Sequence, residues 1–184
     1  MRIALLLVLG SIVVSAQTSS PKERQKYAKS MAKDGAGGIP KLLPYAQDPE
    51  AEVRREVVRS MVAIGGPASL EPLTQAMTDS DEEVQIRATD GVVNFYLPGY
   101  WESGLSGTMK RAGTRVLSRW SDTNDQIVPA HVEVRPEIVE ALGKMANESS
   151  SMVARANAAR AVGVLRGKAA VGDLVQAMTA KDGK

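Results

Sequence analysis

The sequence has no cysteine and a single histidine, His131, among its 184 residues. The absence of cysteine excludes disulfides, thiolate zinc sites, cysteine nucleophiles and lipid-modified cysteines. One histidine also excludes a two-histidine metal site within one chain. We therefore expect a protein that holds no metal and no cofactor.

A strong charge of either sign is also missing. Lysine and arginine number 23 against 21 acidic residues, which leaves a formal net charge of +2. Without a large basic excess to neutralise phosphates, nucleic acid is not an expected partner. Aromatic residues make up only 4% of the chain, and most of them lie between residues 95 and 120.

The single long apolar run lies at the N-terminus. Met1-Arg2 gives a short basic start, residues 3–14 are almost wholly apolar, and Ser15-Ala16 supplies small residues. This order is typical of a secretory signal peptide, and the run is shorter than the ~20 residues that span a bilayer. We expect residues 1–16 to be cleaved after Ala16, with an uncleaved anchor as the alternative. The mature protein is then periplasmic or secreted.

Residues 17–38 form a polar lead-in. The weak helical spacing of Tyr27 and Met31 leaves two interpretations, a short helix or a mobile segment, before a glycine-rich breaker at residues 34–38. Its basic residues are Lys22, Arg24, Lys26, Lys29 and Lys33.

Residues 39–184 repeat themselves. Residues 42–61 match residues 73–92 at an offset of 31. A third copy follows at an offset of 101, which places residues 174–178 on residues 73–77 and Arg155 on Arg54. Fixed periods of this size are typical of stacked helical units.

Each unit reads as two helices joined by a turn. Apolar side chains recur at helical spacing, with Val53, Val57 and Met61 on one stripe. Asp48 precedes this stripe and is expected to cap the helix that follows. The expected helices span residues 39–46, 50–64, 70–77, 82–96, 136–146 and 151–165, and their inward side chains include Leu42, Leu43, Ala46, Val153 and Ala156.

These motifs resemble the HEAT-repeat family in its short bacterial form. The resemblance rests on residues 48–54 (Asp-Pro-Glu-Ala-Glu-Val-Arg), 63–67 and 155–165. It implies an all-α fold, a right-handed α-solenoid of three to four stacked helical hairpins with one irregular insertion. It also implies that Arg54 and Arg155 tie neighbouring repeats by hydrogen bonds. Gln85 replaces the arginine in the second copy, which departs from the pattern.

Residues 97–133 break the repeat. Residues 97–101 read as a loop with exposed rings, and residues 108–120 read as a basic amphipathic helix that ends in tryptophan. Three interpretations stay open: a degenerate repeat helix, a partner-binding surface, or a helix that lies on an anionic membrane. The expected contact set is Tyr100, Trp101, Arg111, Arg115, Arg119 and Trp120.

Catalytic chemistry finds little support in the sequence. No Gly-x-Ser-x-Gly motif accompanies His131, which reads as a loop histidine. Residues 122–125 lack the spacing of a calcium loop and read as a turn. The acids at residues 79–83 lie at a repeat position where acidic side chains cap helices.

The sequence therefore predicts an exported, non-catalytic scaffold that binds a protein partner through its solenoid surface and the insertion. Peripheral membrane binding by residues 108–120 is one alternative. A lyase-like enzyme is another, because the bilin-lyase branch of such repeats is similar, although no cysteine or paired carboxylate marks it here. Solenoids need polar end units, so the incomplete last repeat at residues 169–184 also predicts continuation or self-association at that end.

Overall fold

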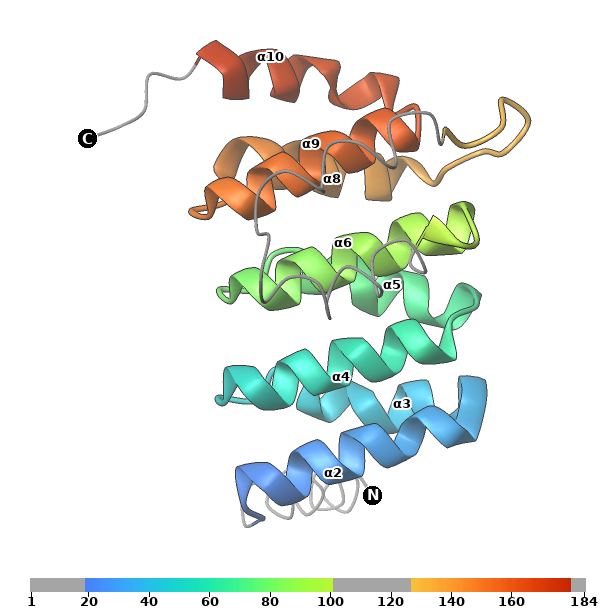
Figure 1. The fold of residues 1–184 in the computed structure, drawn as a ribbon, viewed down its shortest axis with the longest axis vertical. Helices are drawn as coiled ribbons and strands as arrows, with labels where there is room; N and C mark the ends of the chain where they lie inside the picture. The colour runs from blue at the N-terminus through green and yellow to red at the C-terminus, as the bar shows by residue number, and fades with distance from the viewer. Residues whose placement is uncertain (1–18, 101–126, 180–184) are drawn as a thin grey trace, which may run out of the picture. The chain divides into compact units, whose positions relative to one another are not determined.

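The computed structural model of the protein describes residues 19–100 and 127–179, and every regular element in these ranges is helical (Figure 1). The expected all-α class of stacked helical hairpins is confirmed. The chain divides into two compact units, Met1–Ala76 (unit 1) and Met77–Lys184 (unit 2). Each unit has its own set of buried apolar side chains.

Unit 1 packs helix α2 (Pro21–Met31) against helix α4 (Ala51–Ile64), and the two lie side by side in Figure 1. Between them in the chain come the 3-10 turn η1 (Ala32–Gly38), the one-turn helix α3 (Ile39–Leu42) and the turn η2 (Leu43–Tyr45). Helix α5 (Pro67–Ala76) follows α4 and packs on it. The predicted stripe of α4 is confirmed, because Val53, Val57 and Met61 are all buried.

Helix α2 is a repeat helix that lies within the predicted lead-in. Ser20 and Glu23 close a capping box at its start, in which each side chain accepts from the backbone N–H of the other residue. Ala28 is fully buried, and its small side chain suits the close packing of α2 on α4. The short-helix interpretation therefore holds for α2, and helical stacking begins before residue 39.

The first hairpin differs from the prediction at Leu43. Leu42 is buried as expected, but 45% of Leu43 is exposed. Pro44 has no backbone N–H to continue an α-helix, and residues 43–45 take a tighter 3-10 turn. A 3-10 turn rotates the chain further per residue than an α-helix, so the inward placement of Leu43 is wrong.

Unit 2 contains helices α6 (Glu82–Tyr96), α8 (Pro136–Glu148), α9 (Met152–Val164) and α10 (Val171–Thr179), with the turn η3 (Lys168–Ala170) before α10. Helix α9 packs on both α6 and α8, and α10 packs on α8. Gly143 of α8 permits the last approach, because a Cβ atom there would overlap the Asp173 carboxylate of α10.

The buried stripe of α9 lies one residue away from the predicted one. Val153 and Ala156 are exposed, whereas Ala154, Asn157 and Ala158 are buried. The repeat offset explains the shift, because Ala154 lies 101 residues after Val53, a buried residue of α4. The inward placement of Val153 and Ala156 is therefore wrong.

A positive φ recurs at one repeat position shortly after the ends of α2, α4 and α9, the second helices of their repeats. Gly35, Gly65 and Arg166 occupy this position, with φ angles of 56°, 64° and 57°. Residues with a Cβ atom rarely adopt such angles, so glycine suits the position. The Arg166 N–H donates to Gly163 O and the Gly167 N–H donates to Val162 O. Helix α9 thus ends in a Schellman turn that carries arginine where glycine is usual.

The insertion is described only at its two ends, residues 97–100 and 127–133. At the second end the chain returns to α9, where the Val128 N–H donates to Val164 O at 2.9 Å and the Val128 side chain is buried. Five of the predicted contact residues lie outside the described residues, as does the turn predicted at 122–125: Trp101, Arg111, Arg115, Arg119 and Trp120.

Candidate partner-binding surface

A buried ion pair joins α2 to the turn before α4 in unit 1. Arg24 Nε and Nη2 donate to the two carboxylate oxygens of Asp48 at 2.6 and 2.9 Å. The side chains of Arg24 and Asp48 are only 8% and 5% exposed. This bidentate geometry makes the ion pair both strong and directional.

Asp48 therefore does not cap α4 as the sequence predicts. The N-cap of α4 is Glu50, whose side chain makes no capping hydrogen bond, and Asp48 accepts from the Glu50 N–H at 3.0 Å. Burial acts to raise the pKa of Asp48. Hydrogen bonds from Arg24 and the Glu50 N–H, together with the Arg24 charge, outweigh burial and hold that pKa below its ordinary value.

Each other described second helix carries a hydrogen-bond donor at the repeat position of Arg24. Arg54 Nη1 donates to the Asp48 carbonyl at 2.7 Å, and Gln85 Nε2 donates to the Asp79 carbonyl at 2.6 Å. Arg155 donates to the Ala146 carbonyl at 3.1 Å and to the Ala177 carbonyl of α10 at 3.3 Å. The inter-repeat tie implied by the family resemblance is thus present at Arg155.

Gln85 makes the hydrogen bond between repeats with a neutral side chain. It is buried, and its Oε1 accepts from Ser149 Oγ at 2.9 Å, in the turn after α8. Ser149 lies 101 residues after Asp48 and so is its repeat counterpart. A neutral glutamine–serine hydrogen bond in unit 2 replaces the arginine–aspartate pair of unit 1.

Further polar contacts line the seam between α6 and α9. Ser151 Oγ donates to the Glu82 carboxylate at 2.6 Å, and Asn157 Nδ2 donates to Asp90 at 3.2 Å. Thr89 of α6, which is fully buried, donates its hydroxyl to Met145 Sδ of the neighbouring helix α8 at 3.4 Å. Satisfied polar groups of this kind fix the register of packed helices.

Charged side chains lie beside this seam. Arg87 Nη2 pairs with Glu83 at 2.6 Å, while Arg87 Nε is buried with no hydrogen-bond partner among the described residues. Arg160 of α9 places its guanidinium carbon 5.5 Å from the centroid of the Tyr100 ring, within the range of a cation–π contact. Tyr100 is only 6% exposed. The prediction of an exposed ring at Tyr100 is therefore wrong, because α9 supplies a partner for it.

The residues considered for catalysis take structural or surface places. His131 is exposed in the loop before α8, as expected of a loop histidine. Asp81 is the N-cap of α6 and accepts from the Val84 N–H at 3.1 Å, while Asp79 accepts from the Asp81 N–H at 2.8 Å. The interpretation as helix cap and first-turn acids is confirmed for Asp81, Glu82 and Glu83, whereas Asp79, like Asp48, binds within the turn and does not cap the helix.

An open groove of about 360 Å³ lies in unit 2 between the loop before α8 and the turn after α9. Its walls are mostly apolar, with Arg166 and Lys168 as its charged residues and no acidic residue in its lining. General acid–base chemistry needs a paired base or acid within hydrogen-bond reach. The groove lining contains Lys168 but no carboxylate or histidine to pair with it.

Residues 19–100 and 127–179 contain no group of three histidine, cysteine, aspartate or glutamate side chains able to hold a metal ion. None of the helices in these ranges has the length and apolar character needed to cross a membrane.

Comparison with known proteins agrees with this geometry. No curated protein matches the sequence, but the family described as HEAT repeats matches residues 9–92. That range holds α2 to α5 and most of α6, including the tie positions Arg24, Arg54 and Gln85. HEAT repeats are generally protein-interaction scaffolds that stack to present extended surfaces. The match shows HEAT repeats over residues 9–92, and Arg155 of α9 occupies the same repeat position as Arg54 beyond that range.

Proposed function

We propose that the protein is an exported, non-catalytic scaffold that binds a protein partner through its second helices and its insertion. The observation that carries the proposal is the division of roles along α6 and α9. Buried Asn157 and the N-cap residue Ser151 bond α9 to α6. Buried Gln85 and Thr89 bond α6 to α8 and the turn after it. Arg87 and Arg160 lie partly exposed beside these contacts. Arginine and aromatic side chains dominate the binding energy of protein interfaces.

The insertion belongs to the same proposed surface. Tyr100, at its start, lies against Arg160, so the chain enters the insertion directly beside α9. The sequence then supplies the contact residues Trp101, Arg111, Arg115, Arg119 and Trp120. These residues combine large rings with forked cationic donors, which suits a protein partner with acidic and apolar groups.

Export rests on the N-terminal residues. A basic start, an apolar run and Ser15-Ala16 support a cleaved signal peptide and a periplasmic or secreted protein. Mass spectrometry of the protein isolated from the cell envelope should find Gln17 at the mature N-terminus. Recovery of the uncleaved chain from the cytoplasm alone would contradict export.

Site-specific crosslinking in the native envelope tests the partner-binding surface. A photo-crosslinker at Arg160 or Trp101 should capture a partner protein, whereas one at Lys144, exposed on the first helix α8, should not. Equal capture from Lys144, or none at Arg160 and Trp101, would contradict the proposed surface. Trp101→Ala combined with Arg115→Ala should lower the amount captured about tenfold or more, as expected for interface hot spots.

The absence of catalysis is part of the proposal. HEAT repeats are typically scaffolds without catalytic activity of their own. An activity screen of the purified chain should find no turnover, and a reaction abolished by His131→Ala would overturn this part.

A further inference from the structure

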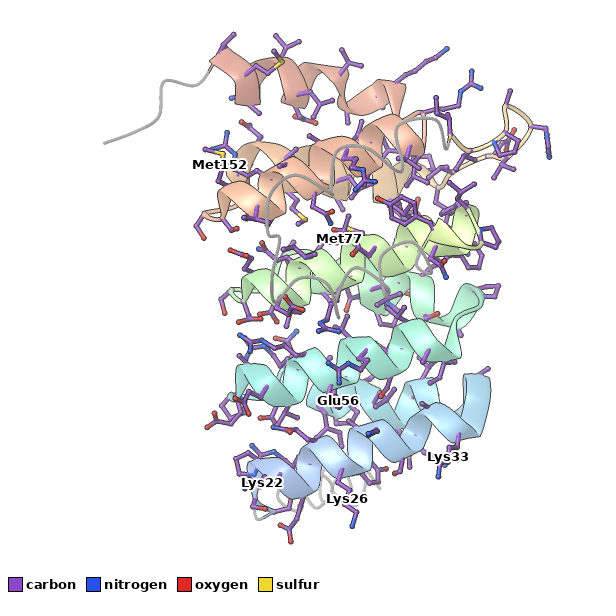
Figure 2. The ribbon with its side chains drawn as sticks, viewed as in Figure 1. Lys22, Lys26, Lys33, Glu56, Met77 and Met152 are labelled. Atoms are coloured by element: carbon purple, nitrogen blue, oxygen red, sulfur yellow. The ribbon has the colours of Figure 1, made fainter. Side chains whose placement is uncertain are left out.

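Helix α2 and the 3-10 turn η1 that follows it carry a row of lysines that the proposed scaffold does not use. All four side chains are exposed. The three on α2, Lys22, Lys26 and Lys29, lie within roughly 60° of the helix circumference and span about 10 Å along its axis. The fourth, Lys33, lies in η1, and Figure 2 shows it projecting, like Lys26, away from α4. We name this row, Lys22, Lys26, Lys29 and Lys33, the lysine stripe.

Other charged side chains near α2 make ion pairs or hydrogen bonds within the protein. Arg24 pairs with Asp48, and Lys41 pairs with Asp34 at 2.6 Å. Glu23 is held by Ser20 in the capping box. Within the part of the chain that the structure describes, no lysine of the stripe makes an ion pair. The stripe is therefore a local excess of positive charge in a chain that is nearly neutral overall.

The repeat itself does not require lysine at these positions. An offset of 30 residues aligns α2 with α4, and it places residues 29–31 (Lys-Ser-Met) on residues 59–61 (Arg-Ser-Met). Two of the aligned positions in α4 are acidic: Glu52 accepts from Gln25 of α2 at 3.2 Å, and Glu56 pairs with Arg59 at 2.9 Å. The α4 counterparts of the stripe are Glu52, Glu56, Arg59 and Ala63.

We propose that the lysine stripe binds an anionic lipid bilayer, with headgroup phosphates as its ligands. Because Lys33 of η1 projects to the same side as Lys26 of α2, the four flexible lysines can bring their ammonium groups to one plane together. Each lysine near an anionic membrane surface contributes about a fivefold factor to binding. Four such contributions give a reversible attachment that weakens as salt screens the charges.

The composition of the stripe favours lipid over protein. Protein interfaces are depleted in lysine and enriched in aromatic residues and arginine, and the stripe contains only lysine. The hydrated ammonium on a flexible stem suits diffuse attraction to headgroups better than a shaped protein pocket.

Vesicle co-sedimentation of the mature protein, residues 17–184, tests the proposal. The vesicles contain either neutral phosphatidylcholine alone or phosphatidylcholine with about one third phosphatidylglycerol, at low and high salt. The stripe variant is Lys26→Gln with Lys29→Gln. The matched control is Lys144→Gln with Lys168→Gln, which removes the same charge from exposed positions of unit 2.

The stripe variant should bind anionic vesicles about 25-fold more weakly than the wild type, at about fivefold for each lysine. The control should change by less than about threefold, and high salt should remove most of the difference between the two variants. Binding to neutral vesicles should be weak and the same for all three proteins, because the substitutions remove only charge and a neutral surface does not attract it. Because the substituted lysines are exposed, the variants should keep the wild-type circular dichroism and unfolding midpoint.

Three results would overturn the proposal. The first is equal weakening by the stripe variant and the control, which would show a net-charge effect. The second is full binding by the stripe variant with loss in Arg111→Gln/Arg115→Gln, which would assign membrane binding to residues 108–120. The third is no binding to anionic vesicles by the wild type, even if an acidic protein or another polyanion binds the stripe. The scaffold proposal is tested separately, because its crosslinks start at Arg160 and Trp101 rather than on α2.

Discussion

Units 1 and 2 use different chemistry at the same repeat position. In unit 1, Arg24 and Asp48 form a buried ion pair with two hydrogen bonds, and in unit 2, Gln85 and Ser149 form a single neutral hydrogen bond. Both contacts join a second helix to the turn of the next repeat. The repeat therefore requires a donor and an acceptor at this place rather than a pair of charges. The charges make unit 1 sensitive to the loss of either partner and to pH.

The helix ends show a second difference between the units. Unit 1 ends α4 with Gly65 at the position of positive φ, whereas unit 2 ends α9 with Arg166 there. Glycine adopts this conformation without strain, and arginine does so at a cost. Unit 2 therefore tolerates a strained residue where unit 1 has the residue that fits.

The largest expected effect comes from breaking the tie of unit 1. Arg24→Ala leaves the Asp48 carboxylate buried without its cation, and loss of one partner of a buried pair costs about 3–5 kcal/mol. Urea unfolding should show this loss, and hydrogen exchange should assign it to the amides of α4. Arg59→Ala, which breaks an exposed pair with Glu56, should cost less than about 1 kcal/mol. A cost below about 1 kcal/mol for Arg24→Ala would show that the ion pair is not needed.

Acid should weaken the tie of unit 1 and spare that of unit 2. Because the pKa of Asp48 is lower in the folded protein than in the unfolded chain, its contribution to stability is complete above the unfolded value of about 4. That contribution is lost as the pH falls below about 4, through the folded pKa. Gln85 and Ser149 do not titrate in this range. Hydrogen exchange at falling pH should show α4 losing protection before α9 does.

The comparison variant for the acid effect is Asp48→Asn, which holds a neutral side chain at every pH. Its unit 1 should be less stable at neutral pH and should change less between pH 5 and pH 3. An acid response equal to that of the wild type would assign the effect to other carboxylates, such as Glu23.

Removing the neutral tie should cost less. Gln85→Ala loses the hydrogen bonds to Ser149 and to the Asp79 carbonyl, which are together worth about 1–2 kcal/mol in the free energy of unfolding. Ser149→Ala should lose about 1 kcal/mol. Urea titration of both variants measures the difference. A larger loss for Gln85→Ala than for Arg24→Ala would reverse the ranking of the two ties.

Exchanging the chemistry sharpens the same comparison. Gln85→Arg combined with Ser149→Asp places the unit 1 residues in unit 2. A double-mutant cycle should give a favourable coupling of about 1 kcal/mol, because charge-assisted hydrogen bonds exceed neutral ones. The double variant should also acquire acid sensitivity in α9. A coupling near zero would show that the surroundings of the unit 2 tie do not accept an ion pair.

The smallest expected effect is a gain in stability at the end of α9. Arg166→Gly removes the strain of a positive φ at a residue with a Cβ atom, and it should raise the free energy of unfolding by about 0.5–1 kcal/mol. Gly65→Ala in unit 1 should act in the opposite direction, because its φ of 64° would then be occupied by a residue with a Cβ atom. Thermal unfolding of the two variants should shift in opposite senses. Destabilisation by Arg166→Gly would show that the arginine side chain itself supports the turn.

The repeat period predicted most of the helices, because buried side chains must recur wherever one hairpin stacks on another. It identified α4, α6, α8 and α9 and the apolar stripe of α4. The error at Val153 arose from spacing within a single helix, where Ala154 could be told from Val153 only by alignment with Val53. Alignment between copies therefore placed buried residues better than periodicity within one copy.

The sequence did not predict that α2 stacks as a repeat helix or that Tyr100 is buried. The apolar pattern of α2 is weak because lysines occupy its outer face, yet Arg24 and residues 29–31 align with α4 at an offset of 30 and could have revealed it. Tyr100 carried no such information. Its ring lies against Arg160, which only the fold brings close to it. Neither the Arg24–Asp48 pair nor the Gln85–Ser149 contact was predicted, since each joins residues from different repeats.

The methionines give each unit an internal reporter of its own opening. Met61 in unit 1 is 1% exposed and Met145 in unit 2 is 5% exposed, whereas Met152 and Met178 are 63% and 86% exposed. Oxidation to the sulfoxide follows exposure, and it places a polar group where an apolar one was packed. Mild peroxide should therefore convert Met152 and Met178 first, at little structural cost. A sulfoxide at Met61 or Met145 would then indicate transient unfolding of the unit that contains that methionine.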